Sequence, residues 1–171
     1  MAFKFKKTLN PNGERMLQEY LVVTTITLSV GDCVELSGDA VTVTEDAGSG
    51  AALGIVDSLR KADGSPLTDN GAGGAFTGTY TTTDSTSVIA SIDLSRTSVY
   101  SVAADAALGT TTGSDMPGYT MDCVAGGETL DESTALTTTG TWMSLGEDPD
   151  PSAADNSVLV VLYESDIFNL A

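Results

Sequence analysis

Three glycines, Gly48, Gly50 and Gly54, are the first candidates for chemistry, because glycine clusters of this kind cradle phosphates in many enzymes. A dinucleotide-binding fingerprint would need a glycine at the position of Leu53. A phosphate loop would need a lysine followed by serine or threonine, whereas here Gly54 is followed by Ile55. Both templates also require a helix after the loop, and the run that follows alternates like a strand. The glycines therefore predict a hairpin return and no cofactor site.

Nucleophilic and metal chemistry is limited by the absence of histidine from the sequence. This excludes Ser-His-Asp and Cys-His nucleophile activation and histidine-liganded metals. Cys33 and Cys123 are too few and too far apart for a disulfide framework or a zinc motif. The negative charge of the chain should also raise a thiol pKa and lower its reactivity. We expect buried structural thiols, and the sequence leaves open whether the two pair.

Carboxylates are abundant, with 24 acidic residues, so a catalytic acid pair is compatible with the composition, although no aromatic platform singles one out. The acidic loop of residues 145 to 156 offers four candidate oxygen ligands for a calcium ion: Glu147, Asp148, Asp150 and Asp155. It lacks the spacing of a calcium-binding loop, which favours a solvated loop and leaves cation binding open. We predict a non-enzymatic protein with no cofactor and no metal.

The net charge of −17 is distributed unevenly along the chain. Lys4, Lys6, Lys7 and Arg15 are four of the seven basic residues, and none follows Arg96. An acidic body cannot release phosphate counterions, so we exclude nucleic acids and anionic membranes as partners. No run approaches the roughly 20 apolar residues of a membrane span, and the basic start lacks the apolar core of a secretory signal. Synthesis in the cytoplasm is the simplest expectation.

The elements that must carry these residues are strands, because apolar and polar residues alternate with a period of two between Gly-Asp turns. The alternation predicts strands within residues 25–30, 33–37, 40–46, 52–59, 88–95, 97–110, 118–126, 134–146 and 157–168, with the run 97–110 passing into a tight turn. We therefore predict an all-β chain: a single antiparallel β-barrel or β-sandwich over residues 21–171, with long loops and a loop-rich insertion around residues 60–87. The last strand is apolar on both faces, which predicts a core or oligomer contact through Val158, Val160, Leu162 and Tyr163.

Residues 1–20 are predicted to be an extended N-terminal arm. The sequence FKFKK alternates aromatic and basic residues, and residues 14–21 are compatible with one or two helical turns. Such an arm can add a strand to the sheet edge of another protein, with its cations steering it to an acidic acceptor. The residues assigned to this contact are Phe3, Lys4, Phe5, Lys6, Lys7 and Arg15. The alternative is a terminus without a function.

Three segments resemble parts of the head decoration (cement, or auxiliary capsid) proteins of tailed bacteriophages. LSVGDCVELSGDAVTVTEDAGSGAALGIVDS looks like their opening β unit, and TSVYSVAADAALGT and TGTWMSLGEDPDPSAADNSVLVVLYES look similar to their later segments. The resemblance is one of strands and turns, without a signature motif. The long insertion and the acidic body depart from it.

The resemblance implies a non-enzymatic virion protein on the capsid exterior. Such proteins bind the outer surface of an icosahedral shell and stabilise contacts between major capsid subunits, often as homotrimers, with an N-terminal arm touching the shell. A different class, a receptor- or glycan-binding tip or fibre module, would use the long Gly/Thr loops, although aromatic residues are scarce. A β-barrel hydrolase with a carboxylate pair is the third alternative.

Overall fold

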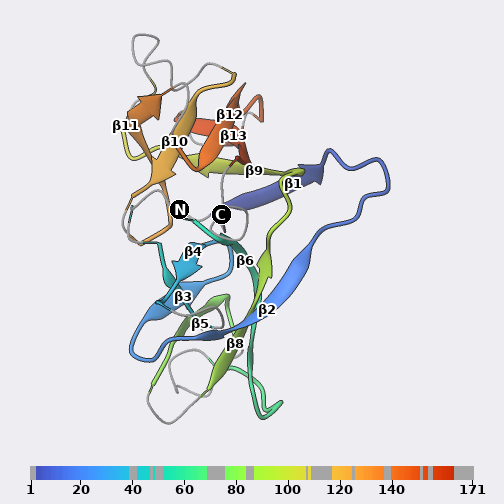
Figure 1. Ribbon diagram of the computed structural model, residues 1–171, viewed down its shortest axis with the longest axis vertical. Coiled ribbons are helices and arrows are strands. Elements are labelled where there is room, and N and C mark those ends of the chain that lie inside the picture. The colour runs from blue at the N-terminus through green and yellow to red at the C-terminus, as the bar shows by residue number, and fades with distance from the viewer. Residues whose placement is uncertain are drawn as a thin grey trace.

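The computed structural model describes residues 3–38, 42–46, 48, 52–68, 76–83, 87–106, 108, 117–124, 126–136, 140–150, 152–153 and 156–163. These residues contain thirteen β-strands and no helix, which confirms the all-β prediction. The strands form a closed barrel, a six-stranded sheet and a two-stranded ribbon. The sheet lies at one end of the long axis of the molecule and the barrel at the other (Figure 1).

The barrel has the strand order β2-β5-β4-β6-β8. Its strands are β2 (Leu17–Val22), β4 (Cys33–Leu36), β5 (Thr42–Glu45), β6 (Gly54–Lys61) and β8 (Val88–Asp93). Neighbours run antiparallel except for β2 and β5, which pair in parallel. The barrel is therefore mixed, in contrast to the antiparallel barrel or sandwich that the sequence predicts. Its closure leaves no free edge on this part of the molecule.

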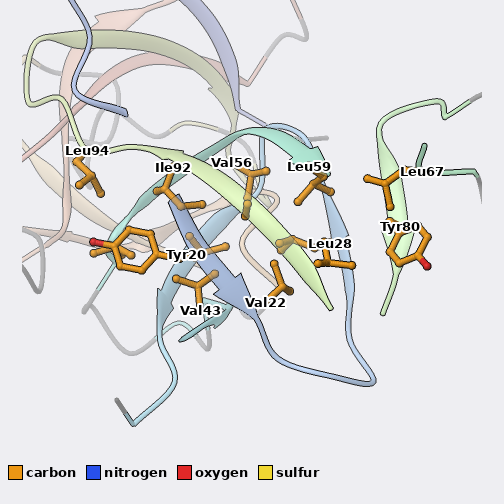
Figure 2. Packing of buried hydrophobic residues seen from close by; sticks show 14 residues of the cluster. Tyr20, Val22, Leu28, Val43, Val56, Leu59, Leu67, Tyr80, Ile92 and Leu94 are labelled. Atoms are coloured by element: carbon orange, nitrogen blue, oxygen red, sulfur yellow. The ribbon is translucent and has the colours of Figure 1, made fainter. Parts of the chain in front are cut away.

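The barrel encloses the first hydrophobic core. On β8 the side chains of Val88, Ala90 and Ile92 are buried on the inner face, as the alternation predicts. Figure 2 shows side chains such as Tyr20 and Val43 pointing toward one another between the strands. Full burial of one such aliphatic side chain contributes about 1.5–3 kcal/mol, so this face fixes the register of the strands.

The ribbon consists of β3 (Thr27–Ser29) and β7 (Thr79–Thr81). It sends Leu28 and Tyr80 into the first core. Because β7 lies within the predicted insertion of residues 60–87, and Leu67 from the same stretch is also buried, part of this stretch belongs to the folded body. Residues 69–75 and 84–86 of the stretch lie outside the described residues.

The six-stranded sheet has the order β1-β9-β13-β12-β10-β11, with every neighbouring pair antiparallel. Its strands are β1 (Lys4–Thr8), β9 (Ser98–Ala103), β13 (Ser157–Leu162), β12 (Trp142–Glu147), β10 (Thr120–Cys123) and β11 (Leu130–Leu136). One face carries the second hydrophobic core, around Trp142 and Met121. Cys33, Ala52 and Ile55 join this core from the barrel side, so the two cores meet through the outer face of the barrel.

The last strand, β13, lies inside this sheet between β9 and β12. Val158, Val160 and Leu162 belong to the second core, while Val161 is buried on the opposite face. The central position explains why the strand is apolar on both faces. Tyr163 follows the end of the strand and is 40% exposed.

The N-terminal residues differ from the predicted arm, because they form two strands of the folded body. β1 pairs with β9, and β2 is a barrel strand; the residues compatible with a helical turn are thus extended. Phe3 is buried in the second core, with its ring centroid 4.7 Å from that of Trp142. Since β1 belongs to the sheet and β2 to the barrel, residues 3–22 connect the two bodies.

The glycine cluster connects β5 to β6. These strands are not neighbours, because β4 lies between them, so the connection is not the hairpin return that the sequence predicts. Gly54 begins β6 where it crosses β8, and a Cβ there would collide with the carbonyl oxygen of Asp93. Only glycine allows this approach. Gly50 lies outside the described residues.

Candidate docking surface

Of the residues predicted to contact a partner, Lys4, Phe5 and Lys7 are exposed, and we group them with the other exposed side chains of the same segment as the N-terminal surface. It comprises the exposed apolar side chains of residues 5–21 together with the neighbouring lysines. Its apolar members are Phe5, Leu9, Met16, Leu17 and Leu21, which are 40–52% exposed. They are five of the seven large hydrophobic side chains exposed among the described residues; the other two are Val30 and Tyr163. Apolar exposure is therefore concentrated in one short part of the chain.

Strand β1 lies at the outer edge of the six-stranded sheet, next to β9 alone. The register shifts between Phe5 and Lys7, which marks a β-bulge. Bulges twist an edge strand and discourage uncontrolled pairing with other chains. Lys4 and Lys7 are exposed on this strand, and no ion pair to either is present in the described part of the protein. The edge thus presents an aromatic ring flanked by positive charge.

Lys6 is directed into the molecule instead. Its ammonium group lies 3.1 Å from Asp148 Oδ2 and 2.9 Å from Asp150 Oδ2. Hydrogen bonds from Ser152 and from Lys6 hold the pKa of Asp150 well below its ordinary value. The acidic loop that the sequence offers as a calcium site thus binds a lysine through two of its four candidate carboxylates. Asp155 lies outside the described residues.

Arg15, also predicted to touch a partner, lies in a polar network between the barrel and the sheet. Its guanidinium donates to Asp93 Oδ2 at 2.8 Å and to Asp57 Oδ1 at 2.7 Å, and its Cζ lies 4.4 Å from the ring centroid of Phe5. Tyr100 also donates to Asp93. Only 22% of the Arg15 side chain is exposed. Arg15 therefore holds Phe5 in place and is not available as a free docking cation.

The carboxylate of Asp93 is buried, and burial alone would raise its pKa. Hydrogen bonds from Tyr100, Ser98 and Ser95 outweigh this cost and lower the pKa below its ordinary value. The adjacent guanidinium of Arg15 adds a favourable charge. Asp93 is consequently an ionised anchor that fixes the base of the N-terminal surface.

A shallow hollow of about 490 Å³ lies beside this surface. It is lined by Asn10 and by residues 14–16 and 94–97, so both the β1–β2 connection and the segment after β8 form its walls. Leu94 and Met16 provide apolar lining, and polar groups surround them. The hollow can receive one apolar side chain of a partner, which a flat β surface cannot.

The structure also brings together residues that sequence spacing does not associate. Cys33 and Cys123 are both free and buried, and they lie beside Asp46. The predicted structural thiols are thus neighbours within the second core, one from a barrel strand and one from the sheet. No local motif predicts that these three residues lie close together, because they come from three separate segments of the sequence.

Comparison of the chain with known protein families, with curated proteins and with solved structures finds no match. Among the described residues, no helix has the length and apolar character that crossing a membrane requires.

Proposed function

We propose that this chain is a non-enzymatic virion structural protein that binds the outer surface of an icosahedral bacteriophage capsid. In this proposal the N-terminal surface contacts the major capsid protein and stabilises contacts between its subunits. The proposal combines the resemblance of the strand and turn pattern to head decoration proteins with the all-β fold.

One observation carries the proposal: exposed apolar side chains and free cations coincide in residues 4–21 of a protein whose net charge is −17. Large apolar side chains left exposed in one segment favour an interaction site there. Lys4 and Lys7 beside it favour an acceptor that is apolar with an acidic rim. The acidic remainder of the protein disfavours nonspecific adhesion to other anionic surfaces.

The folded state of this surface favours adhesion in a second way. Phe5 is held by β-pairing and by Arg15, so binding does not have to order a free tail. Burying the exposed half of one large apolar side chain contributes about 1 kcal/mol. A modest affinity for each copy is sufficient, because many copies on one symmetric shell act together.

The test is binding to expanded, undecorated capsids of the phage that encodes this chain. The protein should bind saturably, and Leu17→Glu with Leu21→Glu should weaken binding at least about tenfold by placing two charges in the apolar contact. Val30→Glu is the control, because Val30 is 40% exposed, close to the 45–47% of Leu17 and Leu21, but lies outside the N-terminal surface. Absence of saturable binding, or equal loss in the control, would contradict the proposal. Deleting residues 1–15 is a poor test, since it removes β1 and Arg15 from the fold.

We further propose that the protein acts as a homotrimer, the state that the resemblance implies. Native mass measurement at micromolar concentration should give three times the mass of the 17.5 kDa chain. A monomer under these conditions would contradict the trimer while leaving capsid binding to be judged by the experiment above. The receptor- or glycan-binding alternative predicts binding to host cells by the isolated protein.

A further inference from the structure

A cluster of three potential metal ligands lies where the barrel meets the sheet. Cys33 begins β4, Asp46 directly follows β5, and Cys123 ends β10. Their sulfur and carboxylate ligand atoms all lie within 4.8 Å of one another. The three residues are only 0%, 1% and 3% exposed, respectively. Two ligands thus come from the barrel and one from the sheet.

Backbone contacts hold the cluster in place. The amide of Asp46 donates to the carbonyl of Cys33 at 3.2 Å, and the amide of Cys33 donates to the carbonyl of Gly127 at 2.9 Å. Gly127 lies in the turn between β10 and β11, with φ of 68°. A Cβ at this position would collide with the Cys33 carbonyl, so a glycine is needed for the turn to approach β4. The convergence is therefore a property of the backbone and not of three side-chain rotamers.

No cation among the described residues balances the charge of Asp46. One carboxylate oxygen accepts from the amide of Gly48 at 2.7 Å, and the other accepts from the thiol of Cys33 at 3.3 Å. Within the described ranges no lysine or arginine forms an ion pair with Asp46. Burial raises the pKa of Asp46 accordingly. A buried carboxylate without a counterion is costly, and a bound cation would remove that cost.

Trp142 supplies a second, independent observation. Its ring is fully buried, and its Nε1–H has no hydrogen-bond partner among the described residues. Trp142 on β12 and Cys123 on β10 lie on neighbouring strands and belong to the same buried cluster. A buried donor without an acceptor is unfavourable. The same donor beside a metal-bound thiolate would be in a favourable arrangement, because it would stabilise the charged ligand.

We propose that Cys33, Cys123 and Asp46 bind a thiophilic divalent cation of the zinc type. Two sulfur ligands and one carboxylate suit Zn²⁺, and ligand atoms about 3.5–4 Å apart are what Zn–S and Zn–O bonds of 2.0–2.3 Å produce in a tetrahedron. Binding releases one proton from each thiol, so two thiolates and one carboxylate surround the ion with a net charge of −1. The described residues thus supply three of the four ligands of a tetrahedral site.

The consequence is a cross-link between the barrel and the six-stranded sheet, at the edge of the second hydrophobic core. Because two ligands come from the barrel strands and one from the sheet, the ion binds the assembled fold and not either half alone. Free energy of binding then becomes free energy of folding. This role is separate from the docking proposed above, since the cluster is buried and lies outside the N-terminal surface.

The experiment uses the full chain, refolded from denaturant under a phosphine reductant with Co²⁺ or Zn²⁺ present, so that burial does not limit entry. Co²⁺ should bind one ion per chain and produce a thiolate-to-cobalt charge-transfer band. Zn²⁺ should raise the midpoint of thermal unfolding, and a chelator should reverse both effects. Absence of the charge-transfer band would overturn the proposal.

Variants assign the ligands. Cys33→Ser and Cys123→Ser should each weaken Co²⁺ binding by more than the roughly 10–100-fold that loss of a ligand-orienting partner costs. Asp46→Asn should weaken binding and leave the charge-transfer band in place. Trp142→Phe, which keeps the ring and removes the N–H, should cost about tenfold. If the serine variants do not fold, the last two variants decide the question.

The matched control is Asp131→Asn with Glu132→Gln. These residues belong to the other converging acidic group among the described residues, which includes Asp105 and is partly exposed. The control should leave Co²⁺ affinity unchanged, and a loss equal to that of Cys123→Ser would overturn the assignment.

A second experiment counts the free thiols in denatured protein that was purified without reductant. Finding none would show a Cys33–Cys123 disulfide and would also overturn the metal site.

Discussion

Two buried aspartates at the junction of the barrel and the sheet have opposite electrostatic surroundings. Asp93 and Asp46 are 2% and 1% exposed. Asp93 has Arg15 beside it and hydroxyl donors around it, and its pKa is lowered despite burial. Asp46 has an amide and a thiol, and its pKa is raised by burial. The two pKa values therefore shift in opposite directions at equal burial. The hydrogen-bond and charge partners of each carboxyl decide whether its ionised or its neutral form is favoured.

The two aspartates share one structural device, a glycine that allows backbones to meet. Gly54 approaches the carbonyl of Asp93, and Gly127 approaches the carbonyl of Cys33 next to Asp46. Only Gly127 also has a positive φ. The junction is thus assembled by backbone contact at both sites, but among the described residues a cation balances the charge of Asp93 and none balances that of Asp46.

The largest effect is expected for Gly127→Ala. The added methyl group collides with the backbone of Cys33. In addition, the alanine must adopt a left-handed backbone conformation, which side chains disfavour. Overpacking and backbone strain each cost about 1–3 kcal/mol, so the free energy of unfolding should fall by about 4 kcal/mol. Gly126→Ala is the control, because Gly126 has φ of 100° but open space around its Cβ position. Equal losses in urea denaturation would show that close approach contributes nothing.

Arg15→Met should lower the free energy of unfolding by about 3 kcal/mol. The substitution keeps the apolar stem and leaves Asp93 buried without its cation, which is the costly way to break a buried pair. The expected loss is at the lower end of the range for broken buried ion pairs, because 22% of the Arg15 side chain is exposed. Arg60→Met removes an exposed pair with Glu19 and should produce no resolvable change. Similar losses in both variants would contradict the role given to Asp93.

Lowering the pH should destabilise the contact between the barrel and the sheet, because it protonates the carboxylate of Asp93. Because the folded pKa of Asp93 is lowered, its contribution to stability is complete above the unfolded value of about 3.9 and is lost as the pH falls through the folded value. The wild-type protein should therefore lose more stability between pH 5 and lower pH than Asp93→Asn does. Denaturation midpoints measured across this range provide the check. A wild-type curve parallel to that of the variant would show that Asp93 is not ionised in the fold.

Much of the fold can be predicted from alternation alone. Residues 88–94 point alternate apolar side chains into the barrel because a strand has a period of two, and the apolar run of residues 157–162 indicates a strand that is covered on both faces. Both kinds of information are local. Alternation does not identify the partner strand. Residues 4–8 pair with β9, which follows 90 or more residues later in the sequence, and the same pattern was equally compatible with a sheet edge of another protein. The predicted arm failed for this reason.

The candidate sites were harder to predict because they depend on charge partners. Counting cations places Arg15 with the lysines, whereas the structure buries it against Asp93. Likewise, Cys33 and Cys123 lie far apart in the sequence, and Asp46 is one of 24 acidic residues without a distinguishing motif. What joins them is the crossing of β4 by the β10–β11 turn, which no local pattern encodes. The pair Gly126–Gly127 in the segment AGGE is the one local indication, because adjacent glycines suggest a turn that approaches another backbone closely.

The smallest effect is expected for Asp46→Asn in the metal-free protein, and it is the sharpest test of the comparison. Asparagine keeps an oxygen that accepts from the amide of Gly48 and removes a buried charge that no cation balances. The free energy of unfolding should change by less than about 1 kcal/mol, in either direction. The equivalent change at Asp93 removes one partner of a buried pair and should cost about 3 kcal/mol. Urea denaturation of both variants in the presence of a chelator measures the difference, and equal losses would mean that Asp46 is balanced by a group of the protein itself. Added Zn²⁺ should raise the free energy of unfolding of the wild type more than that of Asp46→Asn. The reason is that the bound cation balances the charge of Asp46, as Arg15 balances that of Asp93.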